Sequence, residues 1–224
     1  IADARMKSVM GMLKREWEQQ AIAGTSTVLT EMGTLDGVAS TTGWLEDVAF
    51  GSQTVNTVGG LNKGTFSTAN WQNQRQDLGG TANWAANGLT AMTDLMIQTQ
   101  IYAPEGSVDL ILASPGSYSQ YKGQLQAQER YTPKETVLDG GRLALAFNGA
   151  LMYVENNLSG GNGLPSMYFL NTKSMKVVFD SEANFTMTDF ETKSGYAARQ
   201  ANIFVRTQLV ADHLASLGVL IDAG

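Results

Sequence analysis

The clearest alternation of hydrophobic and polar positions lies at the start of the chain, from Ala2 to Gln20. The apolar residues there recur at helical spacing and form one stripe, made of Met6, Val9, Met10, Leu13 and Trp17. Charged residues occupy much of the remaining surface, and this combination predicts an amphipathic helix. The stripe can pack against the core of its own chain, or it can contact a membrane surface or a partner protein. We favour packing against the core, which is the usual fate of such a stripe.

A strand followed directly by a helix is predicted near the middle of the chain. Val108 to Ala113 is a short apolar run, typical of a buried strand. Ser114 and Pro115 then form a favourable N-cap and first-turn pair. The helix that they begin carries Tyr118 and Tyr121 on one face.

A β-hairpin is predicted after this helix. Leu143, Leu145 and Phe147 alternate with smaller residues, as in a half-buried strand. The pair Asn148-Gly149 favours a tight turn, and Ala150 to Glu155 supplies the second strand.

The other predicted elements are one helix and several strands. Apolar spacing predicts the helix from Leu89 to Tyr102, and Pro104 and Gly106 end it. Short apolar or alternating runs predict strands at 167–170, 176–179, 184–188, 196–210 and 217–221. We expect those between 176 and 210 to form an antiparallel sheet. The mixture of helices and strands is typical of an α+β fold.

Three segments lack a clear period and are predicted as connections. Residues 24–52 form a weakly determined connector, with at most a short helix or turn from Gly43 to Phe50. Residues 76–87 are a Gly- and Asn-rich link. Residues 125–141 are polar and should form a long surface loop.

The low content of charged residues changes the picture of the surface. Only 16% of the 224 residues are charged, below the roughly 25% of an ordinary globular protein, and Gly, Asn, Gln, Ser and Thr take their place. Charge depletion is found at the centres of protein interfaces, so it hints at assembly, although a merely uncharged surface explains it as well.

Composition also argues against several classes of partner. The net charge is −6, from 15 basic and 21 acidic residues, and this acidic balance does not suggest that the protein binds nucleic acid. The chain has no cysteine, so it has neither disulfides nor thiolate metal sites. No apolar run reaches the roughly 18 residues of a membrane span, so we expect no membrane partner.

Two segments resemble binding motifs but lack features that those motifs require. Lys63 follows Asn62 and precedes Gly64, whereas a phosphate-binding loop places Gly before the Lys and Ser or Thr after it. The nearby glycines are therefore expected to make turns. Phe66 and Trp71 are predicted to be apolar anchors of an extended segment, because no basic groove accompanies them.

No catalytic, cofactor-binding or metal-binding residues are predicted. The single histidine, His213, has Asp212 beside it, but neighbours on a strand point to opposite faces, so we expect a surface or strand-end histidine. Zinc and EF-hand calcium sites lack ligands at the required spacing. A pair of carboxylates for glycoside hydrolysis stays open, because sequence does not show distances.

The order of these motifs resembles the major capsid proteins of tailed bacteriophages, which have the Hong Kong ninety-seven type fold. Ala2–Gln20 resembles the long spine helix, and VGGLNKGT at 58–65 resembles the Gly-Gly-Leu connection that follows it. VDLILASPGSYSQY at 108–121 resembles the family's strand and helix. The segment ERYTPK at 129–134 resembles the family's Arg-Tyr loop. LALAFNGALMYVE at 143–155 resembles its Phe-Asn-Gly-Ala hairpin, and SMYFLNTKSMKVVF at 166–179 resembles its Tyr-Phe-Leu-Asn-Thr strand. RQANIFVRTQLVADHLASLGVL at 199–220 resembles the long strand and its closing segment.

The resemblance implies a non-enzymatic subunit of an icosahedral head that encloses double-stranded DNA. It implies a peripheral domain from residues 1–88, completed by 176–212, and an axial domain from residues 89–175, completed by 213–224. The partners would be copies of the same chain in pentamers and hexamers, with scaffold, portal or decoration proteins, and DNA inside the shell without sequence-specific contact. The protein would reside in the virion after assembly in the bacterial cytoplasm. The family's N-terminal arm and extended loop would precede Ile1.

Other functions remain open from the sequence. A shell protein of an encapsulin-like bacterial compartment has the same fold and encloses enzymes instead of a genome. A tail or other virion component is a further alternative. A hydrolase with an unseen carboxylate pair is the alternative from a different class.

Overall fold

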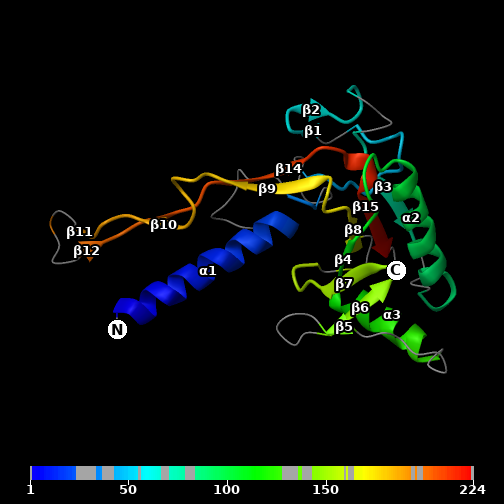
Figure 1. Ribbon diagram of the computed structural model, residues 1–224, viewed down its shortest axis with the longest axis horizontal. Helices are drawn as coiled ribbons and strands as arrows, with labels where there is room; N and C mark the ends of the chain where they lie inside the picture. The colour runs from blue at the N-terminus through cyan, green and yellow to red at the C-terminus, as the bar shows by residue number, and fades with distance from the viewer. Residues whose placement is uncertain are drawn as a thin grey trace.

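The computed structural model describes residues 2–23, 34–36, 43–54, 57–66, 71–78, 84–127, 136–137, 143–158, 160, 164–192, 195 and 199–222. They form two regions (Figure 1). The arm consists of helix α1 (Ala2–Ala23) and a long ribbon of strands within residues 175–211. The compact part contains the other described residues and is built on one sheet. Both pieces of the arm project to the same side of the compact part (Figure 1).

Seven strands form the sheet of the compact part, in the order β3-β15-β8-β4-β7-β6-β5. Their bounds are β3 (Gln74–Asp77), β4 (Leu110–Ala113), β5 (Thr136–Val137), β6 (Leu143–Phe147), β7 (Ala150–Val154), β8 (Leu164–Leu170) and β15 (Gly218–Asp222). The pairs β15–β3 and β4–β7 are parallel, and the others are antiparallel. Strand β15, from the last described residues, lies between β3 and β8, so the sheet joins segments that are far apart in sequence.

The sheet is covered on both faces. Successive residues of β8 point to opposite sides, so Met167 and Phe169 enter one core while Tyr168 and Leu170 enter the other. Helices α2 (Leu89–Ile101) and α3 (Pro115–Ala127) cover the first face. The second face is covered by the end of α1, by parts of residues 34–58, by strand β14 and by the short 3-10 helix η2 (Leu214–Ser216).

Local sequence signals are confirmed where they define a cap or a turn. Ser114 caps α3, because its Oγ accepts a hydrogen bond from the Ser117 N–H at 3.3 Å. The β6–β7 hairpin turns at Asn148 and Gly149, whose φ angles are 48° and 91°. Positive φ at both turn positions matches the twist of the two strands, which explains this residue pair.

The predicted antiparallel sheet between residues 176 and 210 is a narrow ribbon of two chain segments. It contains three antiparallel pairs, β9 (Met175–Phe179) with β14 (Thr207–Ala211), β10 (Thr186–Met187) with β13 (Ile203–Phe204), and β11 (Glu191–Thr192) with β12 (Arg199–Gln200). The predicted strand at 196–210 is therefore present as three short strands separated by breaks.

The predicted connections contain more structure than their sequences suggested. In residues 24–52 the described residues 34–35 and 43–46 are buried, with Leu35, Trp44 and Leu45 in the second core. No helix occurs among the described residues from 43 to 50. Strand β3 overlaps the start of the link at 76–87 and the π-helical turn η1 (Trp84–Gly88) overlaps its end, and β5 lies within the predicted loop at 125–141. The polar sequence of β3 has no apolar alternation, so its partner β15 alone makes it a strand.

A small hairpin precedes the sheet. Strands β1 (Thr57–Val58) and β2 (Leu61–Asn62) are antiparallel, and Gly59 and Gly60 form the turn with φ angles of 59° and 78°. These glycines make a turn, as predicted, because positive φ costs little without a Cβ atom.

Candidate assembly interface

Helix α1 leaves two large apolar side chains exposed and half-buries most of the described part of its apolar stripe. Trp17 is half-buried and stacks on Phe179 of the ribbon, with ring centroids 5.9 Å apart, and Ile22 is buried in the second core. Nearer the N-terminus, Val9 and Met12 are 49% and 63% exposed. Met12 lies outside the predicted stripe, and within the stripe Met10 and Leu13 are half-buried, so the prediction that the stripe packs against the core is wrong at Val9. The reason is geometric, because α1 extends beyond the region that the compact part covers (Figure 1).

The ribbon also exposes apolar side chains. Val177 and Val178 are adjacent on β9, so they point to opposite faces, yet they are 41% and 52% exposed. Large apolar residues with similar exposure follow along the ribbon, namely Phe179, Met187, Phe190, Phe204 and Val210. A two-stranded ribbon alone is only marginally stable in water. The arm therefore offers two exposed faces that contacts from outside this chain would stabilise.

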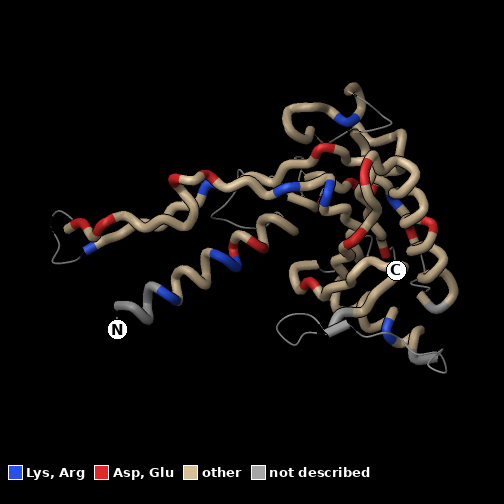
Figure 2. The backbone as a smooth tube through the Cα atoms, in the orientation of Figure 1, with Lys and Arg blue, Asp and Glu red and all other residues tan. Residues whose placement is uncertain are grey.

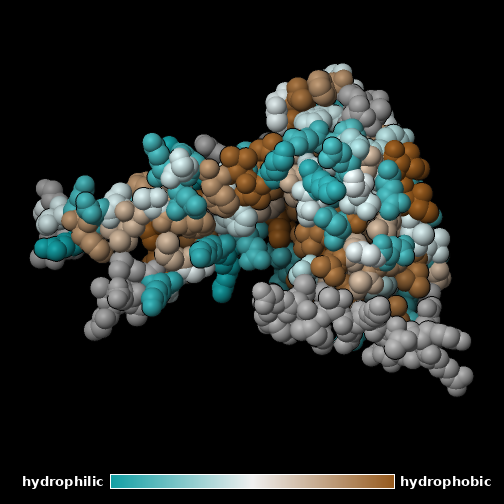
Figure 3. Space-filling view, viewed as in Figure 1, coloured by the Kyte–Doolittle hydropathy of each residue, from teal (hydrophilic) through white to brown (hydrophobic). Residues whose placement is uncertain are grey.

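Hydrophobic and charged groups are interspersed on the arm. Figure 3 shows brown surface along the arm, most clearly where it meets the compact part, with teal residues between the brown patches. Charged residues are spread thinly over the backbone, and basic and acidic residues both occur along α1 (Figure 2). Such a surface combines apolar contact area with a polar rim, which is the composition of many protein interfaces.

A second exposed apolar site lies on α2 in the compact part. Ile97 and Ile101, one turn apart, are 50% and 70% exposed. Close to the end of the helix, Tyr102 contacts Phe50 with ring centroids 5.0 Å apart. The compact part thus has an outward-facing apolar strip of its own.

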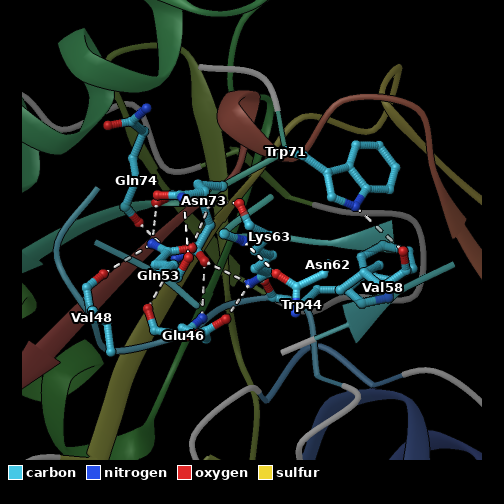
Figure 4. A network of polar contacts seen from close by, with 12 residues as sticks. Trp44, Glu46, Val48, Gln53, Val58, Asn62, Lys63, Trp71, Asn73 and Gln74 are labelled. Atoms are coloured by element: carbon cyan, nitrogen blue, oxygen red, sulfur yellow. Dashed lines mark hydrogen bonds and ion pairs between the residues drawn. The ribbon is translucent and has the colours of Figure 1, made fainter. Parts of the chain in front are cut away.

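Lys63, which the sequence placed in a turn, is fully buried next to Glu46. Its Nζ lies 3.3 Å from Glu46 Oε1 and donates to the Trp44 carbonyl and, at 3.2 Å, to Asn73 Oδ1 (Figure 4). Burial lowers the pKa of Lys63 to about 8, although the Glu46 carboxylate opposes that shift. A buried amine with all its donors directed at protein atoms is no phosphate site, in agreement with the sequence analysis.

Side-chain amides continue this buried polar network. The Gln53 amide donates to the carbonyls of Val48 and Asn73 at 2.9 and 2.7 Å. The Gln72 amide donates to the carbonyls of Gln53 and Lys63 at 3.1 and 3.0 Å. The network therefore fixes residues 46–63 to the start of β3. Sequence reasoning missed it, and the only signal was the run of amide residues at 72–74.

The remaining residues singled out from the sequence are one histidine and two aromatic residues. His213 follows β14 and precedes η2, and the Asp212 carboxylate instead pairs with Lys176 Nζ at 3.0 Å. Trp71 packs against the second core and donates from Nε1 to the Val58 carbonyl at 3.3 Å. Phe66 meets Trp71 edge-on but is 56% exposed, so the prediction that it is an anchor is wrong.

Two negative findings concern only the described residues. Among them, no cluster of three or more His, Cys, Asp and Glu side chains has an arrangement that could hold a metal ion. No helix in this part of the chain has both the length and the apolar character needed to span a membrane.

Comparison with known proteins identifies a relative in fold. No family model and no curated protein matches the chain. Among solved structures, the holo-SrpI encapsulin complex from Synechococcus elongatus PCC 7942 is similar, with a TM-score of 0.50 and 13% sequence identity. The match covers 67% of this chain and 54% of that chain, so this chain spans about half the length of the encapsulin. The structure thus has a capsid-like fold similar to that of an encapsulin shell protein.

Proposed function

We propose that this protein is a structural shell subunit that acts by assembling with copies of itself. The observation that carries the proposal is the arm, in which α1 and both faces of the ribbon expose large apolar residues. Obligate interfaces commonly bury more than about 2,000 Å² and are rich in such residues. The fold similarity to an encapsulin shell protein supports the same conclusion.

In its finer form, the proposal is a major capsid protein of a tailed bacteriophage. Pentamers and hexamers of the chain would form an icosahedral head around double-stranded DNA, with the protein located in the virion. Residues 1–88 and 176–212 would be the peripheral domain, and 89–175 and 213–224 the axial domain. Strand β3 would then be the contribution of the first segment to the axial sheet. Scaffold, portal or decoration proteins would be its further partners.

A second candidate is the shell of a bacterial protein compartment. The similarity to an encapsulin favours this candidate. Both functions use the same fold and the same kind of self-assembly, and they differ in what the shell encloses.

Light scattering and negative-stain microscopy of the purified protein test the assembly itself. We expect closed shells under some condition of salt, pH or concentration. A persistent monomer under all conditions would contradict the proposal, and tubes or rings would indicate a tail component instead.

The contents of shells isolated from the natural source distinguish the two candidates. A phage head protects double-stranded DNA from nuclease, whereas a compartment contains a defined protein cargo. Nuclease protection and mass spectrometry of the same shells therefore separate them.

A further inference from the structure

We propose that Met12 and Met187 are redox-sensitive modification sites that regulate assembly. Oxidation of their thioethers to sulfoxides weakens the assembly of free subunits, and reduction restores it. The inference rests on the proposed function, because it concerns the arm as an assembly surface.

The described methionine side chains differ sharply in exposure. The chain has ten methionines and no cysteine, so thioethers are its only sulfur groups. Met12 on α1 and Met187 on β10 are 63% and 41% exposed, and both elements belong to the arm (Figure 1). Met10 and Met175 are half-buried. Four methionines lie in the core beneath α2 and α3 with exposures of 3% or less, namely Met92, Met96, Met152 and Met167. A reagent in water therefore reaches the described sulfur atoms of the arm most easily at Met12 and Met187.

Each exposed thioether belongs to an apolar part of the arm surface. Met12 lies one turn from Val9 on the same side of α1, and Val9 is 49% exposed. Met187 is directly opposite Ile203 in the β10–β13 pair, so these two side chains share a face of the ribbon. A second copy of the chain that covers these apolar groups therefore also covers the two thioethers.

The reaction is a two-electron oxidation of sulfur by hydrogen peroxide. The thioether sulfur attacks one peroxide oxygen, an S–O bond forms, the O–O bond breaks, and water leaves. The sulfur is oxidised and the peroxide is reduced. A methionine sulfoxide reductase reverses the change, because two of its thiols become a disulfide while the oxygen leaves as water.

The product is unsuited to an apolar interface. Oxidation converts a flexible apolar side chain into a polar one. A sulfoxide oxygen that enters an interface without a hydrogen-bond donor loses its hydration and gains no partner. Each such sulfoxide should therefore raise the protein concentration needed for shell formation about tenfold. The compact part should keep its fold, because its four core methionines are enclosed.

Peptide mass spectrometry after limited treatment with hydrogen peroxide tests which sulfur atoms react. Trypsin releases residues 8–14 and 177–193 as separate peptides. Met187 is the only methionine of the second peptide, and fragmentation distinguishes Met12 from Met10 in the first. We expect oxygen to be added first at Met12 and Met187, and much later at the four core methionines. Equal rates at the exposed and the core positions would overturn the proposal.

Light scattering against protein concentration measures the effect on assembly. Protein oxidised at both sites should need a concentration about a hundredfold higher, if the two effects add, and the reductase should return it to the starting value. Should untreated and oxidised protein assemble at the same concentration, the redox inference fails while the proposed function stands. Should untreated protein remain monomeric under all conditions, the proposed function fails and this inference fails with it.

Finished shells provide an independent check. Peroxide added to them should oxidise Met12 and Met187 more slowly than it does in free subunits, because neighbouring copies cover both sites. Equal rates in shells and free subunits would show that the two side chains stay outside the interface, and would overturn the proposal.

Leucine substitutions provide matched variants. The double change Met12→Leu and Met187→Leu nearly keeps the side-chain volume and removes the reactive sulfur. Whatever concentration this variant needs for assembly, peroxide should not change it. Met92→Leu removes a sulfur from the core and should leave assembly as sensitive to peroxide as in the unchanged protein. If Met92→Leu does not fold, the unchanged protein and the double variant still decide. Loss of assembly in the peroxide-treated double variant would assign the effect to another site and overturn the proposal.

Discussion

The compact part and the arm contain the same types of apolar residue but use them in opposite ways. In the compact part, every residue of β8 from Pro165 to Leu170 is buried, because helices cover one face of the sheet and loops and the end of α1 cover the other. In the arm, Val177 to Phe179 of β9 are exposed on both faces. The comparison indicates that the compact part holds most of the folding free energy, while the arm leaves apolar surface that the described part of this chain does not cover.

The two regions meet in a limited set of contacts. Leu209 and Ala211 of β14 enter the second core at the base of the ribbon. Trp17 joins α1 to the ribbon by stacking on Phe179. The ring centroid of Phe179 in turn lies 6.4 Å from that of Phe185. These contacts anchor the base of the arm, so we expect its order to decrease toward the far end when neighbours are absent.

The largest effect on the stability of the isolated chain should come from the centre of the sheet. Phe169→Ala removes a fully buried ring and should lower the free energy of unfolding by about 3–5 kcal/mol. Urea denaturation measures this change. Phe204→Ala is the matched control on the arm, where the ring is 51% exposed, and it should change the value by less than about 0.5 kcal/mol. An equal loss of unfolding free energy in the two variants would contradict the distinction between the compact part and the arm.

The pH dependence of stability reports the state of Lys63. Its folded pKa is about 8, below the unfolded value of 10.5, so an unfolded chain with a free amine binds more protons between these values. The free energy of unfolding should therefore rise with pH across that window, by about 3 kcal/mol in total.

Urea denaturation from pH 7.5 to 10.5 measures this rise. The Glu46→Gln variant should show the rise over a wider window, because Glu46 no longer raises the pKa of Lys63. A profile that falls with pH in this variant would contradict the assignment.

A smaller loss is expected at the hairpin turn of the compact part. Gly149 has a φ of 91°, where a Cβ atom is unfavourable although the surrounding space is open. Gly149→Ala should therefore cost about 1–2 kcal/mol from backbone strain alone. Gly116→Ala also enters open space but at an ordinary φ within α3, and it should be neutral or stabilising. Thermal unfolding of both variants checks the difference.

The smallest effect on folding should accompany a large effect on assembly. The double change Val178→Ala and Phe204→Ala should leave the unfolding free energy of the isolated chain nearly unchanged. It should raise the protein concentration needed for shell formation at least about tenfold, which corresponds to about 1.4 kcal/mol of lost association. Light scattering against concentration measures this threshold.

Gln208 provides the control, because it lies directly opposite Val178 on the same face of the ribbon. Gln208→Ala removes polar contact and should shift the protein concentration needed for shell formation much less than the double change does. An unchanged threshold in the double variant would show that the exposed apolar residues do not drive assembly.

Much of the fold was accessible from the sequence because its signals are local. The periodicity of residues 2–20 and 89–102 predicted α1 and α2, and Ser114-Pro115 and Asn148-Gly149 predicted a cap and a turn that the structure confirms. Strand β3 was missed because its sequence, QRQD, has no apolar face. The buried network was missed because Lys63, Glu46 and Asn73 are individually typical of surfaces.

The amino-acid sequence by itself determined where most helices, strands and turns form, and that the charge on this protein is sparse. Only the tertiary structure decided that β15 lies between β3 and β8, that Lys63 is buried against Glu46, and that Val9 in the stripe of α1 is exposed. The physical reason is that the spacing of hydrophobic residues indicates which face of a helix or strand is apolar. The packing of distant segments decides what covers that face, and on the arm the described chain covers it only in part.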